Sequence, residues 1–221
     1  MPEILYYVAA SLDGFIAAPD GGIAWLAPFE CSGEDYGYAA FYASTDALIL
    51  GSRTYEQALT FDPWPYPGKP CWVFSRRLLS RARPEVTVTA QAPREVAAEL
   101  DARGIRRAWL VGGGRLAAAF RAEGLISEII VSIIPVILGA GIPLFAAPAA
   151  DLAGSPGPSQ VSTTGEPLRL VEHKVYPNGV VQLRYVSPAP AQQSPSIQPP
   201  SRRVQVRSQA LRPNCSPFEV Q

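Results

Sequence analysis

Two glycine-containing segments of the chain have the residue types that bind phosphate groups. They are Gly51-Ser52-Arg53-Thr54, which follows the strand-like run of residues 46–50, and Gly112-Gly113-Gly114-Arg115-Leu116, which leads into a helix-like run. Glycine allows the backbone to approach a phosphate closely, while the free amides and the dipole at a helix N-terminus favour an anion. Each segment taken alone is equally well explained as a tight turn without a ligand.

A third segment adds a hydroxyl and two guanidinium groups. Ser75, Arg76 and Arg77 come at the end of the strand-like run that begins at residue 71. Ligands of α/β proteins bind at the carboxyl ends of strands, so these side chains would suit the 2′-phosphate of NADP. The alternative is a pair of solvated surface arginines. The G-x-G-x-x-G fingerprint of Rossmann domains is absent from the chain, so a dinucleotide site here requires a different architecture.

Acidic and aromatic residues are the candidates for contacts with a substrate. Asp13 lies between Leu12 and Gly14, where we expect a buried turn-forming residue or a pocket residue. Trp25 follows a glycine-rich loop and either covers a ring-shaped ligand or fills the core. Three further carboxylates could polarise a substrate or be solvated: Glu30, Glu34 and Asp35. The single histidine, His173, has no Asp or Ser placed to form a triad with it, so we predict a structural role.

Composition excludes several classes of function. Hydrophobic residues make up 48% of the 221 residues, charged residues 17%, and 19 Lys+Arg balance 19 Asp+Glu. This composition predicts a packed core and argues against electrostatic binding to nucleic acid or membranes. The three cysteines show no metal-ligand spacing, so we predict no metal site and a reducing cytoplasm. No export signal is recognised, and no apolar run reaches the ~18 residues of a membrane span.

The hydrophobic pattern predicts strands that alternate with helices. Strands are expected over residues 4–10, 46–50, 71–75, 86–89, 107–111 and 126–134, and helices over residues 35–43, 93–103 and 116–122. A further helix opens at Ser52, the expected N-cap, and residues 168–176 and 180–185 form a hairpin. Residues 138–145 are predicted to be a loop. The pattern indicates an α/β three-layer sandwich whose mixed central sheet is mostly parallel, with an antiparallel C-terminal hairpin.

The end of the chain differs in composition from the rest. Residues 187–221 are rich in Pro, Ser and Gln and carry four arginines against one glutamate. Such a segment cannot bury enough apolar surface to offset its ordering entropy, so we predict a disordered tail after a domain of residues 1–186. A basic arm for an acidic partner is the alternative. Residues 146–165 lack periodicity and are expected to be a surface loop or a missed element.

Taken together, these motifs resemble the dihydrofolate reductase superfamily, and within it the C-terminal reductase domain of the riboflavin-biosynthesis protein. The resemblance covers residues 3–186 and is carried by residues 10–17, Trp25-Leu26, residues 46–56, residues 111–114, residues 135–145 and residues 178–183. It implies a dihydrofolate reductase-like mixed sheet and an NADPH-dependent reductase. It also implies a homodimer formed through the late strands. The zinc-binding deaminase half of the bifunctional protein is absent from this sequence.

The resemblance assigns roles to individual residues. Ala9, Ala10 and Ile16 would line the nicotinamide pocket, with Asp20-Gly21-Gly22 as a lid. Residues 51–54 and Gly112 to Leu116 would bind phosphates, the second segment through a cis Gly112-Gly113 peptide. Ser75 and Arg76 would bind the 2′-phosphate. Trp25-x-x-Pro28-x-Glu30 copies the family's tryptophan, proline and acid, which makes Glu30 a candidate proton source alongside Asp13 and Trp25.

The substrate side departs from the riboflavin-pathway reductase. That enzyme has an arginine soon after its tryptophan for the sugar phosphate, whereas residues 30–36 here are acidic and aromatic. We therefore expect a small heterocycle, similar to a pteridine or an aminopyrimidine, rather than a phosphorylated ribose. The alternative from another class is a nucleotide-binding or oligomer-forming module without turnover. A nucleic-acid binder acting through the basic tail is a third reading.

Overall fold

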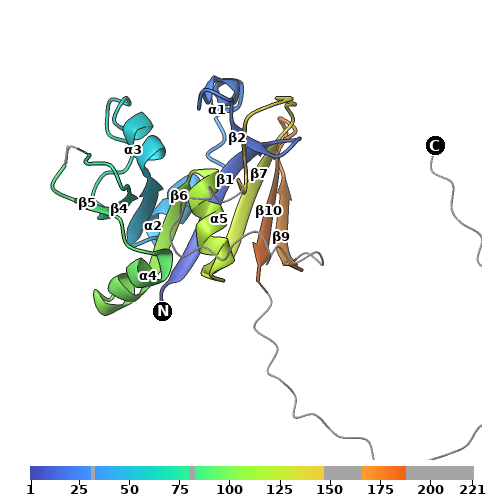
Figure 1. The fold of residues 1–221 in the computed structure, drawn as a ribbon. Coiled ribbons are helices and arrows are strands. Elements are labelled where there is room, and N and C mark those ends of the chain that lie inside the picture. Colours follow the sequence, from blue (N-terminus) through green and yellow to red (C-terminus); the bar gives the residue numbers. More distant parts are fainter. Residues whose placement is uncertain (31–32, 80–82, 147–165, 188–221) are drawn as a thin grey trace, which may run out of the picture. The chain divides into compact units, whose positions relative to one another are not determined.

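An eight-stranded mixed sheet forms the centre of the computed structural model (Figure 1). The structure describes residues 1–30, 33–79, 83–146 and 166–187. The connection of residues 146–165 and the tail of residues 187–221 lie outside the described residues, apart from their first residues. In sheet order the strands are β5 (Val86–Thr89), β4 (Cys71–Phe74), β3 (Ala47–Gly51), β6 (Arg107–Gly112), β1 (Glu3–Ser11), β7 (Ile126–Ile134), β10 (Val181–Val186) and β9 (Arg169–Val175).

The strand directions confirm the predicted topology. β1 pairs in parallel with β6 and β7, and β3 pairs in parallel with β4 and β6. β4 and β5 are also parallel, whereas β10 pairs antiparallel with both β7 and β9. β1 reads as a nearly continuous apolar run because helices and loops cover both of its faces, and Ile4, Leu5 and Tyr6 are buried.

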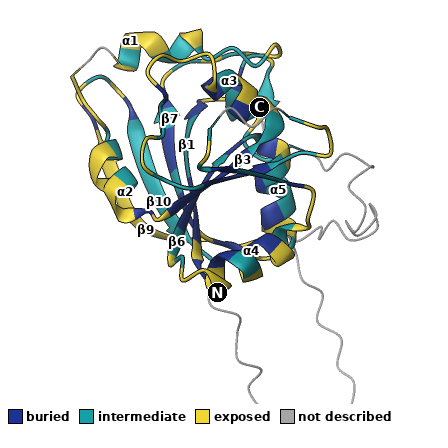
Figure 2. Cartoon of the chain, turned by 90° about the vertical axis from the view of Figure 1, so that its left-hand side faces the viewer, coloured by how far each residue is buried: buried dark blue, intermediate teal, exposed yellow. Residues whose placement is uncertain are grey.

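Helices lie on both faces of the sheet, which makes the predicted three layers. Figure 2 shows α4 (Pro93–Ala102) and α5 (Gly114–Ala122) on one side and α2 (Tyr38–Ser44) on the other. The core on the α4 and α5 side includes Leu110 and Phe120, and the core on the α2 side includes Phe41. α3 (Ser52–Ala58) contributes to the α2 side, and α1 (Ala27–Glu30) follows a 3-10 turn at Ala24–Leu26.

The structure corrects one prediction about a helix end. The N-cap of α3 is Gly51, not Ser52, and no side chain caps the helix. The chain leaves β3 with Gly51 in an extended conformation and enters the helix at once, so Ser52 already occupies the first helical position. In contrast, α4 begins at Pro93 and stops before Gly104, which has φ 74°, as the sequence predicts.

A second, two-stranded sheet was missed by the sequence analysis. β2 (Phe15–Ala17) pairs antiparallel with β8 (Ile142–Pro143), within the segment that was predicted to be a loop. Glycine and proline in this segment are typical of loops, and a strand of two residues leaves no periodicity to detect. The pairing depends on Gly141, because a Cβ there would lie 2.2 Å from the Ala17 carbonyl oxygen.

The turn after β1 is joined to the loop after β7 by hydrogen bonds. Asp13 is exposed, and its carboxylate accepts hydrogen bonds from the Ser11 hydroxyl at 2.6 Å and from the amides of Leu138 at 3.1 Å and Gly139 at 2.7 Å. These bonds, that of Ser11 above all, lower the pKa of the Asp13 carboxyl below its ordinary value. Asp13 is therefore a turn-forming residue, which was one of the two alternatives that the sequence predicted. It is exposed, however, and not buried as predicted.

We predict that Gly141→Ala lowers the free energy of unfolding by about 1–3 kcal/mol, because the new methyl group overlaps the β2 backbone. Chemical denaturation measures the change. Gly51→Ala is the matched control, since a Cβ there meets its nearest atom at an ordinary 3.5 Å and Gly51 has φ −79°. The control is expected to be neutral or up to about 1 kcal/mol more stable. Equal stabilities of both variants would contradict the tight approach of β8 to β2.

We also predict that the Asp13 carboxylate makes stability depend on pH. Because its pKa is lower in the folded state, its contribution is complete above the ordinary value of 3.8 and is lost as the pH falls through the lower folded value. Asp13→Asn is therefore expected to lower Tm at about pH 7, and the difference from wild type should shrink as the pH falls below about 4. A Tm difference that stays constant over this range would contradict the prediction.

Candidate functional site

The phosphate-binding candidates meet at one edge of the sheet. β3, β6 and β1 are parallel neighbours, so their carboxyl ends share an edge, which lies towards the top of Figure 1 together with α1 and the start of α3. Leu50 of β3 pairs with Gly112 of β6, which places the β3–α3 and β6–α5 junctions side by side. This is the edge at which α/β sheets bind ligands.

The two glycine junctions are in contact with each other. A Cβ on Gly51 would lie 3.5 Å from the Gly112 carbonyl oxygen, and a Cβ on Gly113 would lie 3.6 Å from the Thr54 hydroxyl oxygen. The Gly112-Gly113 peptide is cis, as the resemblance implied. Two helix N-termini are therefore brought together, and their amides carry the partial positive charge that an anion requires.

Arginines without an ion pair gather at the same edge. Arg53, Arg76 and Arg115 follow β3, β4 and β6, are exposed, and make no ion pair within the described part of the chain. Arg77 differs, because its guanidinium lies 3.0 Å from the Glu56 carboxylate of α3. The two neighbouring arginines therefore differ in their ion pairing. Arg77 is engaged by Glu56, so Arg76 is the one that an external phosphate could use.

A hollow of about 430 Å³ lies beside Arg76 at the carboxyl ends of β4 and β5. Its volume falls in the range of small-molecule sites. The Ser75 hydroxyl accepts a hydrogen bond from the Arg77 amide at 3.0 Å, so it shapes the turn that presents Arg76. The lining residues are Ser75, Arg76, Arg77, Leu78, Leu79, Val88, Thr89 and Ala90.

The expected lid loop is held against α3. The Gln57 side-chain amide donates a hydrogen bond to the Gly21 carbonyl at 3.2 Å, and the Ala18 amide donates to the Gly22 carbonyl at 2.9 Å. Of the expected nicotinamide-pocket residues, Ala10 is only 1% exposed and belongs to the core on the α4 side. Ala9 is half-buried and faces the opposite side, and Ile16 in β2 packs against the α4-side core.

Aromatic side chains gather next to Ala9 at the carboxyl ends of β1 and β7. We call this group the carboxyl-edge aromatic cluster; it consists of buried Ile134, Tyr176 and Val180 with Ala9, Trp25, Leu26, Phe29, Tyr36 and Val136 packed against them. Trp25 thus fills space in this cluster. Glu30 ends α1 and is exposed, whereas the Asp13 carboxylate is engaged by the three hydrogen bonds described above.

Gln57 and Tyr176 are the residues of this edge that the sequence analysis missed. Gln57 lies within α3, and its hydrogen bond to the Gly21 carbonyl leaves no signal in the sequence. Tyr176 comes directly before the hairpin turn of residues 177–179. Its position at a strand end beside the end of β7 is the one signal that pointed to this edge.

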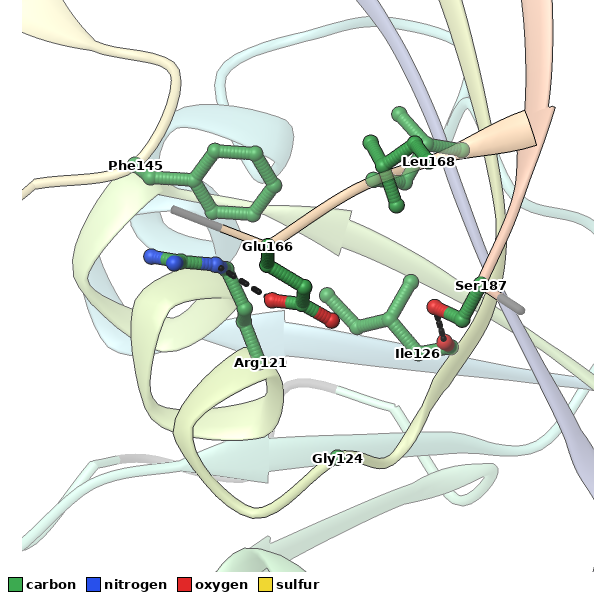
Figure 3. A pocket seen from close by; sticks show the side chains of 8 residues that line it. Arg121, Gly124, Ile126, Phe145, Glu166, Leu168 and Ser187 are labelled. Atoms are coloured by element: carbon green, nitrogen blue, oxygen red, sulfur yellow. Dashed lines mark hydrogen bonds and ion pairs between the residues drawn. The ribbon is translucent and has the colours of Figure 1, made fainter. Parts of the chain in front are cut away.

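A smaller hollow lies apart from the candidate site, towards the amino-terminal end of β7 (Figure 3). Its volume is about 80 Å³, too small for a cofactor. Arg121 lies on its wall, but its guanidinium is already 3.1 Å from the Glu166 carboxylate and stacks over Phe145. We assign no ligand to this hollow.

No helix in the described residues is long and apolar enough to span a membrane.

Two solved structures have folds similar to that of this chain. A putative riboflavin biosynthesis protein from Shewanella sp. PV-4 has a TM-score of 0.71 and 26% identity, and the match covers 86% of this chain and 100% of that one. The bifunctional deaminase and 5-amino-6-(5-phosphoribosylamino)uracil reductase of Thermotoga maritima has a TM-score of 0.62 and 14% identity, over 84% of this chain and 56% of that one. The second likeness concerns the fold alone.

Two curated sequences from Bacillus subtilis are similar to this chain. Uncharacterized protein YwjB is 43% identical over 144 residues, which is 65% of this chain and 82% of YwjB. Uncharacterized protein YyaP is 27% identical over 194 residues, which is 83% of this chain and 94% of YyaP. The model of the RibD C-terminal domain family matches residues 2–181. The chain therefore belongs to the RibD C-terminal domain family and has the fold of its riboflavin-pathway reductase-like members.

Proposed function

We propose that the protein is an NADPH-dependent reductase of a small heterocyclic substrate related to pteridines or aminopyrimidines. The observation that carries this proposal is the contact between the two glycine junctions, at an edge where three arginines follow the strands and have no ion pair among the described residues. A pyrophosphate and a further phosphate need such a set of amides and guanidinium groups. The family membership and the resemblance to dihydrofolate reductases support the same cofactor.

The residues present fit a dinucleotide with a 2′-phosphate. Residues 51–54 and 112–116 would bind the phosphates through helix N-termini, and Arg76 would bind the 2′-phosphate at the hollow next to β4. When bound, NADPH supplies the hydride, so the protein needs to orient its partners and exclude water. The loop of residues 20–22, held by Gln57, lies where it would cover such a site.

The three proposed catalytic residues have different roles. Asp13 acts as a positioning residue, because its carboxylate is engaged in joining two loops. Trp25 forms one wall of the substrate side, and exposed Glu30 at the end of α1 is the proposed proton source.

The scattered cysteines favour a reducing compartment, and we propose a cytoplasmic location on that ground.

We predict that Arg53→Ala and Arg76→Ala each weaken NADPH binding by about 1.5–3 kcal/mol, because each removes a charge-assisted hydrogen bond. Titration with NADPH and then NADH, followed by tryptophan quenching and energy transfer to the nicotinamide, measures both affinities. Wild type should bind NADPH at least about tenfold more tightly than NADH. Only Arg76→Ala is expected to abolish this preference.

Arg106→Ala is the matched control for both substitutions. Arg106 is also exposed and without an ion pair among the described residues, but it precedes β6 and lies at the opposite edge of the sheet. Its loss should leave both affinities unchanged. Binding of neither nucleotide by wild type would refute the reductase proposal, whereas binding without turnover of any heterocycle would favour the non-catalytic module.

We further propose that the protein forms a homodimer through β9 and β10. β9 is the outer strand of the sheet and all seven of its residues are exposed, including Leu170 at 47%, Val171 at 39% and Val175 at 68%. An outer strand that pairs on one side only and carries exposed apolar side chains is a ready template for another copy of itself. The family resemblance gives the same expectation.

We predict that wild type elutes at twice the 23.7 kDa of the single chain in size-exclusion chromatography with light scattering. Val171→Glu should shift the protein to the monomer, because it places a charge in the apolar contact. Phe61→Glu is the control, since Phe61 is 47% exposed but follows α3. A monomeric wild type, or equal effects of both variants, would refute the proposed interface.

A further inference from the structure

A short helical segment carries two of the three proposed catalytic residues. It consists of the 3-10 turn Ala24–Leu26 and the helix α1 (Ala27–Glu30), and it includes Trp25 and Glu30. Both elements lie within the described residues, and neither contains a buried residue. So short a helix is not stable by itself in water, so contacts with the rest of the protein must hold it in place.

Tyr36 has an unusual backbone conformation for a residue with a side chain. Its φ is 53°, and among the described residues it is the one non-glycine residue with a positive φ. Such strain persists where the surrounding contacts fix the residue, and it is concentrated at functional sites. The preceding Asp35 carboxylate accepts hydrogen bonds from the amides of Gly37 at 2.9 Å and Ala39 at 3.3 Å. The backbone on both sides of Tyr36 is therefore held at the start of α2.

The Tyr36 carbonyl is bonded to two strands of the central sheet. It accepts hydrogen bonds from the Tyr7 hydroxyl of β1 at 3.1 Å and from the Gln182 side-chain amide of β10 at 3.0 Å. Gln182 also donates to Ser132 Oγ of β7 at 3.0 Å. Burial raises the pKa of Tyr7 to about 12, so its hydroxyl remains a donor at neutral pH. The Tyr36 backbone is thus tied to β1, β7 and β10.

The other end of Tyr36 reaches α1. Its hydroxyl donates to the Phe29 carbonyl at 2.9 Å and accepts from the Asn178 side-chain amide at 2.5 Å. Its ring meets the Tyr176 ring edge-on with 4.8 Å between centroids. The Phe29 carbonyl belongs to the planar peptide that joins Phe29 to Glu30, so this bond restricts the backbone from which the Glu30 side chain extends.

We propose that Tyr36 is a positioning residue that holds α1, and with it Glu30 and Trp25, against the carboxyl edge of the sheet. This inference rests on the proposed reductase function, in which Glu30 is the proton source. A proton donor acts only within hydrogen-bond reach of the atom that it protonates, so its position matters as much as its acidity. Glu30 is exposed at the end of α1, and the bond to the preceding carbonyl restricts where it can lie.

Hydrogen exchange tests the docking of α1 without cofactor or substrate. The amides of Leu26 and Ala27 donate to carbonyls three residues earlier in the chain, so their exchange reports the opening of this segment. Tyr36→Phe keeps the ring and removes the hydroxyl. It is expected to accelerate exchange over residues 24–30 at least about tenfold, while exchange in α4 and α5 stays as in wild type.

Tyr42→Phe is the matched control for the exchange experiment. The Tyr42 hydroxyl also donates to a backbone carbonyl at 2.9 Å, that of Pro67, but Tyr42 lies in α2. Its loss should leave exchange over residues 24–30 unchanged. Unchanged exchange in Tyr36→Phe, an equal acceleration in both variants, or an equal acceleration in α4 and α5 would overturn the proposal.

Steady-state kinetics with NADPH and 7,8-dihydropterin as the probe substrate test whether Tyr36 acts through Glu30. Tyr36→Phe is expected to lower kcat at least about fivefold and to leave NADPH affinity unchanged. Added to Glu30→Gln, it should cause almost no further loss, because both substitutions affect the same group. Losses that multiply would overturn the positioning role.

Failure of this inference and failure of the proposed function give different results. No binding of NADPH by wild type would refute the reductase, and no reduction of 7,8-dihydropterin would count against the proposed substrate class. In both cases the exchange experiment still decides whether the Tyr36 hydroxyl holds α1.

Discussion

The parallel pairing of β1 with β6 on one side and β7 on the other is the constraint on which the site depends. Parallel neighbours need crossover connections, so each strand is followed by a segment that starts at the same edge. The β3–α3 junction, the β6–α5 junction and the turn after β1 are therefore gathered there, although they are far apart in the sequence. A different strand order would leave the same residues far apart.

The charges of the molecule are distributed in a way that supports this edge as the binding edge. Several arginines elsewhere are paired with nearby carboxylates, as Arg184 is with Glu128 at 2.8 Å, although Arg106 at the opposite edge has no ion pair among the described residues. Such pairs contribute little when they are exposed, but they leave no unbalanced charge on the surface. Arg53, Arg76 and Arg115 follow three neighbouring strands and lack such pairs within the described residues. A chain of zero formal net charge thus still carries three such arginines at the ends of neighbouring strands, where α3 and α5 begin.

The sequence predicts the regular elements well because their signals are local. The strand over residues 126–134 has the predicted bounds, and the glycine-rich junctions follow their strands as expected. The failures come from contacts between distant segments. The pairing of β8 with β2 depends on the space beside Gly141, and the difference between Arg76 and Arg77 depends on Glu56 in another helix. The Tyr176 hydroxyl is of the same kind, because only the folded neighbours show that no group in the described part of the chain bonds to it.

The two halves of the carboxyl edge differ in chemistry, and this difference bears on how the chain relates to its family. The half beside β3, β4 and β6 combines glycine with arginines that have no ion pair among the described residues, whereas the half beside β7 and β10 holds the aromatic cluster, with Lys174 over the Tyr176 ring. Under the proposed function, the first half suits a phosphate-rich cofactor and the second a neutral ring. Under the same proposal, substitutions around Trp25 would alter the substrate and leave the proposed phosphate-binding half intact, because that half is built from other strands. Retention of the fold and of the proposed cofactor site is therefore compatible with a substrate that differs from that of the riboflavin pathway.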